Sequence, residues 1–217
     1  KVDRGGHLHL EDLSTEMDGG AAVDVIAVTQ GTASTIRCLI AGAKSASPAA
    51  YGGDGVFLAN QSALVAKDTV FQGNQGAGIH VTSGARAKIE ACTFKENGDA
   101  GFLVAQSGTG TILGSEFIGN GLVGVYLSNQ GSVEIEDTAF RGHGVAGVQS
   151  EGSSEGRLKR CRFTETDGHG VQGLETTKLW IQASKFTGCG GFGLEASSKA
   201  EVHLKDCEFS ANTRGGV

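Results

Sequence analysis

Apolar and polar positions repeat along this chain with a period of 23 residues. One repeat contains two segments that alternate apolar and polar residues, Ile79 with Val81 and then Ala87 with Ile89. A third short segment follows and contains Phe94. Alternation with a period of two is typical of a strand with one buried face. The pattern therefore predicts three short strands in each repeat.

The repeat holds its phase over the last three quarters of the chain. Glycine recurs every 23 residues from Gly55 to Gly216. Three strands that close after 23 residues form one coil of a parallel β-helix, whereas a leucine-rich repeat would need a leucine consensus and a helical segment. We therefore expect an all-β, right-handed, single-stranded parallel β-helix (a solenoid) of about eight to nine coils, because parallel crossovers are right-handed. Phenylalanine occupies one position in seven successive repeats: Phe71, Phe94, Phe117, Phe140, Phe163, Phe186 and Phe209.

Each inward position should contact its own copy in the next coil, roughly 4.8 Å away. The phenylalanines are then expected to form a stack of rings inside the coil. Asparagine in a turn can adopt the left-handed conformation and donate its amide to the neighbouring coil, so we predict an asparagine ladder. The ladder position, three residues after each phenylalanine, contains Asn74, Asn97, Asn120, His143, Thr166, Cys189 and Asn212.

The motif F-x-x-N-x-x-x-G-[VI]-x-[LV] covers residues 71–81 and 117–127 in full, and 94–104 except at Phe102. It resembles the β-helix repeat of the pectin-lyase-like superfamily, also called the CASH repeat. The resemblance implies a parallel β-helix. It also implies two classes of function, because the family includes polysaccharide lyases, hydrolases and epimerases as well as non-catalytic coils in F-box proteins, kinase-linked proteins and signalling adaptors.

Residues 1–217 are expected to form one β-helix domain. Residues 55–217 form its regular coils, and residues 1–54 form irregular N-terminal coils with an inserted loop at 44–54. The chain begins near a predicted strand and ends inside one. We therefore interpret it as part of a longer protein, or as one whose uncapped coils are covered by a partner or associate end to end.

Net charge and cysteine content limit the classes of partner and the cellular compartment that we expect. The net charge of −6 does not favour nucleic acid, and no apolar segment is long enough for membrane insertion. Cys92, Cys161 and Cys207 share one inward column, and Cys92 and Cys161 lie three coils apart, roughly 14 Å at strand spacing. That separation is too long for a disulfide, so we expect buried reduced thiols and a cytoplasmic protein.

The outward position of the first strand supplies the candidate binding face. Its first half is aromatic and apolar, and its second half is amide and acidic. Such a row is suited to stacking on sugar rings or gripping a peptide, unless a loop or a partner domain covers it. The resemblance implies that family enzymes place their substrate groove on this face. The row consists of Phe57, His80, Leu103, Tyr126, Gln149, Gln172 and Glu195.

A basic segment forms a second candidate site. It is suited to a phosphate, an acidic peptide or an anionic sugar. The alternative is a solvent-exposed face whose charge is balanced by Glu134, Glu136 and Asp137 on the preceding coil. The basic residues are Arg157, Lys159, Arg160 and Arg162.

Catalytic groups are hard to find in the pattern. Glycosidases use paired carboxylates, and the first-strand face offers only Glu151 and Glu195, two coils apart, with no aspartate pair. His143 and Cys189 occupy one turn position but lie roughly 10 Å apart, so neither a metal nor another cofactor is expected. We therefore predict a non-catalytic recognition or scaffold module for a protein or carbohydrate partner. The alternative is a polysaccharide-active enzyme or a fragment of one.

Overall fold

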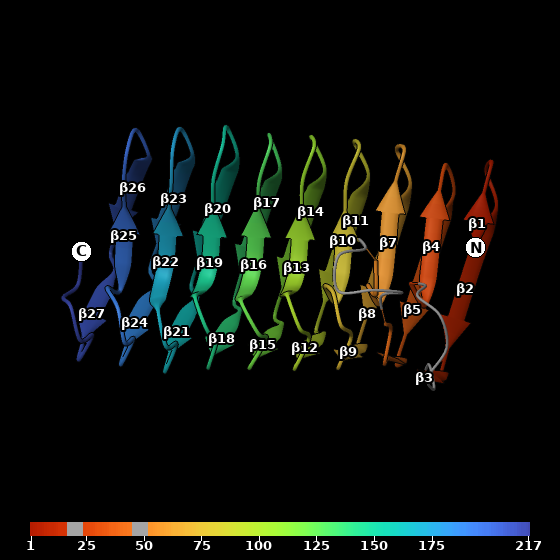
Figure 1. Ribbon diagram of the computed structural model, residues 1–217, viewed down its shortest axis with the longest axis horizontal. Coiled ribbons are helices and arrows are strands. Elements are labelled where there is room, and N and C mark those ends of the chain that lie inside the picture. Colours follow the sequence, from red (N-terminus) through yellow and green to blue (C-terminus); the bar gives the residue numbers. More distant parts are fainter. Residues whose placement is uncertain (17–23, 45–51) are drawn as a thin grey trace.

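The computed structural model describes residues 1–16, 24–44 and 52–217. These residues form 27 strands, which assemble into three parallel sheets of nine strands each. The three strands of one coil belong to three different sheets, and every coil adds one strand to each sheet (Figure 1). The fold is thus a parallel β-helix, as predicted, with nine coils. The described part of the chain contains no helix that is long and apolar enough to cross a membrane.

We name the sheets A, B and C in the order in which the chain visits them. Sheet A consists of β1 (Val2–Asp3), β4 (Ile26–Thr29), β7 (Val56–Ala59), β10 (Ile79–Val81), β13 (Ala100–Val104), β16 (Val123–Leu127), β19 (Ala146–Ser150), β22 (His169–Gly173) and β25 (Leu194–Ala196). Sheet B consists of β2 (His7–Glu11), β5 (Thr32–Ile36), β8 (Ala63–Lys67), β11 (Arg86–Glu90), β14 (Thr109–Leu113), β17 (Ser132–Glu136), β20 (Glu155–Lys159), β23 (Lys178–Gln182) and β26 (Glu201–Lys205). Sheet C consists of β3 (Ser14–Glu16), β6 (Leu39–Ala41), β9 (Val70–Gln72), β12 (Thr93–Lys95), β15 (Glu116–Ile118), β18 (Ala139–Arg141), β21 (Arg162–Thr164), β24 (Lys185–Thr187) and β27 (Glu208–Ser210).

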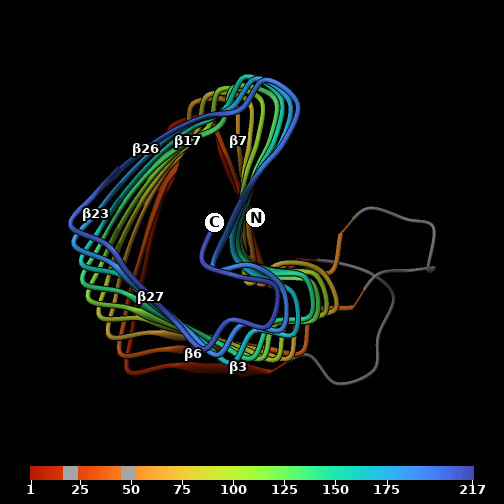
Figure 2. The same ribbon diagram turned by 90° about the vertical axis from the view of Figure 1, so that its left-hand side faces the viewer.

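The register between coils follows the sequence period. Phe94 pairs with Phe71 and with Phe117, and Leu103 pairs with Tyr126. Viewed along its axis, the molecule shows the coils overlaid on one another with a gradual twist (Figure 2). The sequence separation between paired residues is longer than 23 in the N-terminal part, where Ile40 pairs with Phe71. Residues 45–51 of the predicted inserted loop 44–54 lie outside the described ones.

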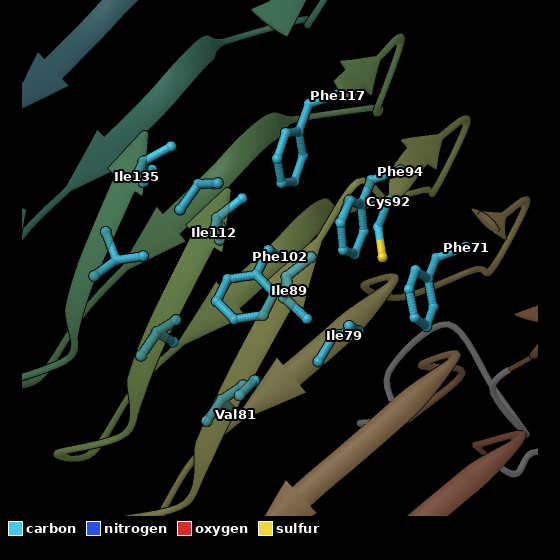
Figure 3. Packing of buried hydrophobic residues seen from close by; sticks show 14 of the residues in the cluster. Phe71, Ile79, Val81, Ile89, Cys92, Phe94, Phe102, Ile112, Phe117 and Ile135 are labelled. Carbon is cyan, nitrogen blue, oxygen red and sulfur yellow. The ribbon is translucent and has the colours of Figure 1, made fainter. Parts of the chain in front are cut away.

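The phenylalanine column forms the predicted stack inside the coils. The rings of Phe94 and Phe117 lie 4.6 Å apart at 3°, and those of Phe117 and Phe140 lie 4.9 Å apart at 11°. All members from Phe71 to Phe186 are fully buried. Figure 3 shows part of the stack beside the aliphatic residues of sheets A and B. Burial of large apolar side chains in every coil is the main force that holds the coils together.

An additional buried ring is accommodated by a glycine in the same coil. Phe102 points inward from β13, and its ring lies 6.3 Å from that of Phe94 at 77°. Gly110 on β14 occupies the inward position held by Ala87 and Val133 in the adjacent coils. A Cβ atom at Gly110 would lie 2.6 Å from Phe102 Cε1. The missing side chain therefore leaves the space that the extra ring fills.

The asparagine ladder is present, but its backbone geometry differs from the prediction. Asn74 Nδ2 donates to Asn97 Oδ1, and Asn97 Nδ2 donates to Asn120 Oδ1, each at 2.9 Å. The left-handed residue is the one before the asparagine, such as Glu96 with φ 55°, rather than the asparagine itself. The expectation of a left-handed asparagine was therefore wrong. A left-handed preceding residue turns the chain so that the asparagine side chain points inward, where its amide reaches the next coil.

The ladder changes its chemistry at His143. Asn120 N donates to His143 Nδ1 over 3.2 Å, and burial lowers the pKa of His143 to about 4. His143 is fully buried, and its Nε2 and the hydroxyl of Thr166 have no hydrogen-bond partner among the described residues. The ladder resumes where Cys189 N donates to Asn212 Oδ1. His143 thus holds the ladder together as a neutral imidazole.

All five cysteines are free thiols. Cys38, Cys92 and Cys161 are buried, and burial raises the pKa of the Cys92 thiol to about 11 and that of the Cys161 thiol to about 12. In the same column Cys92 N donates to Ser115 Oγ. Cys92 and Cys161 thus pack as small apolar groups, because a desolvated thiol of raised pKa remains protonated and unreactive at neutral pH.

Candidate functional site

The structure places the predicted row of outward residues in one column of sheet A. Their backbones are paired directly from coil to coil, and all seven side chains are half-buried. We define the sheet-A face as this column together with the turn residues that contact it. The column contains Phe57, His80, Leu103, Tyr126, Gln149, Gln172 and Glu195.

At the N-terminal end of this face, Asp54 fixes the imidazole of His80. Asp54 lies in the turn before β7 and is only 6% exposed. Its Oδ1 accepts a hydrogen bond from Ala77 N at 2.7 Å, and its Oδ2 lies 3.1 Å from His80 Nδ1. The Phe57 ring packs edge-on against the imidazole at 5.2 Å. Because a carboxylate only accepts, the neutral imidazole carries its proton on Nδ1 and keeps a lone pair on Nε2.

Two further aspartates surround this pair. Asp24 Oδ1 accepts a hydrogen bond from Asp54 N at 3.1 Å. Desolvation raises the pKa of both Asp24 and Asp99, and the nearby charge of Asp54 raises each further. The prediction from the sequence considered only the outward strand positions, and it did not place these aspartates beside the face. These aspartates belong to the turns before β4, β7 and β13, so they do not appear in the alternating pattern of the strands.

A tyrosine and a glutamate form the middle of the face. The hydroxyl of Tyr126 donates to Glu151 Oε1 in the turn after β19. Desolvation raises the pKa of Tyr126, and the charges of Glu151, Asp99 and Glu175 add to this effect. Carboxylates beyond both ends of the sheet-A strands thus raise the pKa of one central tyrosine.

A second polar cluster lies at the C-terminal end. Gln172 Nε2 donates to Glu195 Oε2 at 2.6 Å, and His169 Nε2 lies 3.3 Å from the same oxygen. Phe192 N donates to His169 Nδ1 at 3.2 Å, which places the proton of the neutral imidazole on Nε2, towards Glu195. The ring of Phe192 stacks on His169 at 6.0 Å. These contacts connect adjacent coils, so the side chains are held in place before any ligand arrives.

The structure divides the predicted basic segment between two sheets. Arg157 and Lys159 point outward from β20 in sheet B, whereas Arg162 belongs to β21 in sheet C. Arg160, in the turn between them, donates to Asp137 through Nε at 2.7 Å and Nη2 at 2.8 Å. The four residues therefore do not form one surface.

The acidic residues of the preceding coil neutralise part of this segment. Lys159 Nζ lies 3.1 Å from Glu136 Oε1, and Arg160 also pairs with Glu136. Hydrogen bonds from these cations lower the pKa of Glu136 and of Asp137. Among the residues that the structure describes, Arg157 and Arg162 form no ion pair. Arg157 is thus the member whose charge remains available on sheet B.

Sequence reasoning missed Trp180, which lies beside Arg157. The guanidinium of Arg157 lies 4.2 Å from the Trp180 ring centroid, and the His203 imidazole stacks on the indole at 5.8 Å and 8°. The signal was present in the 23-residue period, because the three residues share one outward column of sheet B. Reading the outward column of the second strand, as was done for the first, would have found them.

A metal centre receives no support from the geometry. Within the described ranges, no three histidine, cysteine, aspartate or glutamate side chains are grouped so that they could hold a metal ion. His143 and Cys189, the metal-capable residues of the ladder turn, are instead part of the hydrogen bonds between coils.

The family follows from the sequence match and the observed coil. Residues 24–176 and 146–217 match the family model described as the right-handed β-helix region. The chain belongs to this right-handed β-helix family. The expected right hand and the resemblance to pectin-lyase-like coils are thereby confirmed. No curated protein matches the chain.

The chain is also distantly similar to a solved structure. It is the catalytic unit of a thermostable GH87 α-1,3-glucanase from Streptomyces thermodiastaticus strain HF3-3, which is 12% identical to this chain, with a TM-score of 0.41. The similarity covers 99% of this β-helix and 51% of the glucanase unit. The chain thus spans about half the length of that unit.

Proposed function

We propose that this β-helix is a recognition module that binds an extended, uncharged carbohydrate along the sheet-A face. The observation that carries the proposal is the pre-organised row of polar side chains. Asp54 holds His80, Gln172 and His169 hold Glu195, and each contact links neighbouring coils. Polar groups fixed in advance lose little side-chain entropy on binding, which favours recognition of the hydroxyl groups of a sugar.

The charge of the face supports an uncharged ligand. Carboxylates occur at both edges of the strands, with Asp24, Asp54 and Asp99 before them and Glu151 and Glu175 after them. Carboxylates accept hydrogen bonds from hydroxyl groups but repel carboxylates and phosphates. A neutral glycan therefore fits this face better than a polyuronate or a nucleic acid.

Glycoside hydrolysis is a second candidate, and the aspartate cluster is the observation that favours it. A carboxyl group of raised pKa beside an ionised one is the arrangement from which glycosidases draw their acid and base. Asp99 would donate its proton to the glycosidic oxygen as the bond from the anomeric carbon breaks. A water molecule would add to that carbon and release its proton to His80 Nε2, which Asp54 orients.

Calorimetric titration with linear neutral oligosaccharides tests the binding proposal. We expect His80→Ala and Tyr126→Phe each to weaken binding about tenfold, the effect of one lost hydrogen bond of about 1.4 kcal/mol. Lys88→Gln on sheet B is the matched control and should leave the affinity unchanged. Equal affinity in all four proteins, or preference for a polyuronate, would contradict the proposal.

The same oligosaccharides separate recognition from catalysis. A recognition module leaves them intact, so the number of reducing ends should stay constant during incubation. New reducing ends that disappear in Asp99→Asn, while that variant still binds the ligand, would instead establish the hydrolase.

A further inference from the structure

A groove of about 570 Å³ crosses the outer surface of sheet B, away from the sheet-A face. It spans five strands, β14, β17, β20, β23 and β26, and runs from Leu113 to Lys205. Five coils at strand spacing make it roughly 19 Å long, the length of about six residues of extended chain. We call it the sheet-B groove.

The aromatic side chain at its centre offers no free face. Arg157 belongs to the coil before Trp180 and His203 to the coil after it, so the two cover opposite sides of the indole. A sugar ring or a nucleobase needs an exposed aromatic face on which to stack. The sandwich presents the edge of the indole instead, which argues against a carbohydrate or a nucleic acid in this groove.

Hydrogen-bond donors remain unused along the groove. Within the described part of the chain, Arg157 makes its ring contact with Trp180 but donates no hydrogen bond, and the Trp180 indole N–H and the Lys205 ammonium also have no acceptor. By contrast, Arg37 donates to Asp12 and Glu11 in the same way that Arg160 donates to Asp137. Arg37 and Arg160 thus donate hydrogen bonds to carboxylates of the preceding coil. Arg157 is instead held in place by the indole, and its N–H donors are free.

We propose that the sheet-B groove binds an extended acidic peptide segment of a partner protein. Its carboxylates would accept hydrogen bonds from Arg157, the Trp180 indole N–H and Lys205, because a guanidinium binds carboxylate with two parallel hydrogen bonds. An aliphatic side chain would cover Leu113, which is 40% exposed at the other end. The net charge of −6 repels acidic peptides from the rest of the surface, so binding concentrates at this cationic end of the groove.

Trp180 is the only tryptophan in the chain and reports directly on the groove. The probe is a capped eight-residue peptide that alternates leucine with aspartate, titrated while indole emission is recorded. A saturable emission change is expected, and none is expected with the matched peptide that carries lysine in place of aspartate. A change with a neutral or uronate oligosaccharide but none with the acidic peptide would overturn the proposal.

Variants then locate the site. Arg157→Gln should weaken binding about tenfold, measured by the anisotropy of a labelled peptide so that the altered indole environment does not interfere. Lys178→Gln removes a charge from β23, the strand of Trp180, outside the groove. It should leave the affinity unchanged, provided that both variants unfold at the temperature of the parent. Equal weakening by both would mean that general charge attraction holds the peptide, which would also overturn the proposal. Neither result bears on glycan binding by the sheet-A face.

Discussion

The sheet-A face and the sheet-B groove lie on the same coils, yet they use their polar groups in opposite ways. On sheet A the polar side chains hold one another across coils, as Asp54 holds His80 and as Gln172 and His169 hold Glu195. In the groove Arg157 and Lys205 have no polar partner among the described residues, and Trp180 fixes the position of Arg157. A uniform scaffold therefore supports one surface organised by internal hydrogen bonds and one surface with free donors. The first should contribute to stability, whereas the second should contribute mainly to binding.

The largest effect should come from the core that both surfaces share. Phe117→Ala removes a fully buried ring from the middle of the stack and should lower the free energy of unfolding by about 3–5 kcal/mol. Chemical denaturation measures this loss. Both ligands should be released together as the variant unfolds, and the loss of only one would show that the two surfaces are stabilised by separate parts of the molecule.

Acid should act first on the sheet-A side. His143 lies beside Gly124 of β16, and its pKa is lowered from 6.5 to about 4 by burial. Above pH 6.5 the imidazole is neutral in both the folded and the unfolded chain. Between pH 6.5 and 4 only the unfolded chain takes up the proton, so the free energy of unfolding should fall by about 3 kcal/mol.

Denaturation at pH 7 and pH 4.5 measures this dependence, with His143→Asn as the control. Asparagine restores the ladder residue of the neighbouring coils without a titrating group, so this variant should lose the histidine contribution. If the parent and the variant show the same pH dependence, other groups are responsible for it.

The next comparison is between two neighbouring carboxyl groups on the sheet-A side, through the variants Asp54→Ala and Asp99→Ala. Asp54→Ala leaves the amide of Ala77 without its acceptor and releases His80, which should cost about 1–3 kcal/mol. Asp99→Ala removes a carboxyl group that makes no side-chain hydrogen bond in the described structure, and should change stability by less than about 0.5 kcal/mol. Equal losses in thermal unfolding would contradict the structural role assigned to Asp54.

Arg157→Gln should have the smallest effect on stability, although it has a large effect on the proposed peptide binding. It removes an exposed cation–π contact of about 0.5 kcal/mol and no ion pair. Thermal unfolding of the variant beside its parent measures the difference. A loss above about 2 kcal/mol would show that Arg157 supports the fold, and the contrast between the two surfaces would then disappear.

Much of the fold follows from the sequence period because backbone hydrogen bonds between coils preserve register. Phe94 and Phe117 are in phase in the sequence and therefore stack in the structure. The same logic places His80 and Tyr126 in one column of sheet A. Phe102 departs from the repeat, and Gly110 compensates for it at a position that follows eight residues later in the same coil. Only the packing shows that these two departures belong together.

The candidate sites were predicted in part. The sequence identified the outward row of sheet A because every member occupies a strand position. It did not reveal Asp54 as the partner of His80, because turn residues have no fixed direction in the repeat and the contact depends on how the turn folds over the strand. It grouped Arg160 with Arg157 because they are adjacent in sequence, whereas the corner between β20 and β21 turns them to different surroundings.

The amino-acid sequence by itself determined the 23-residue coil, the inward columns and the residues that share each outward column, since these depend only on spacing and on the alternation of strands. The tertiary structure alone decided which neighbouring side chains join. It placed the aspartates of three turns around His80, enclosed Trp180 between Arg157 and His203, and left the donors of Arg157 free. Those outcomes depend on turn conformation and side-chain rotamers, which spacing along the chain does not specify.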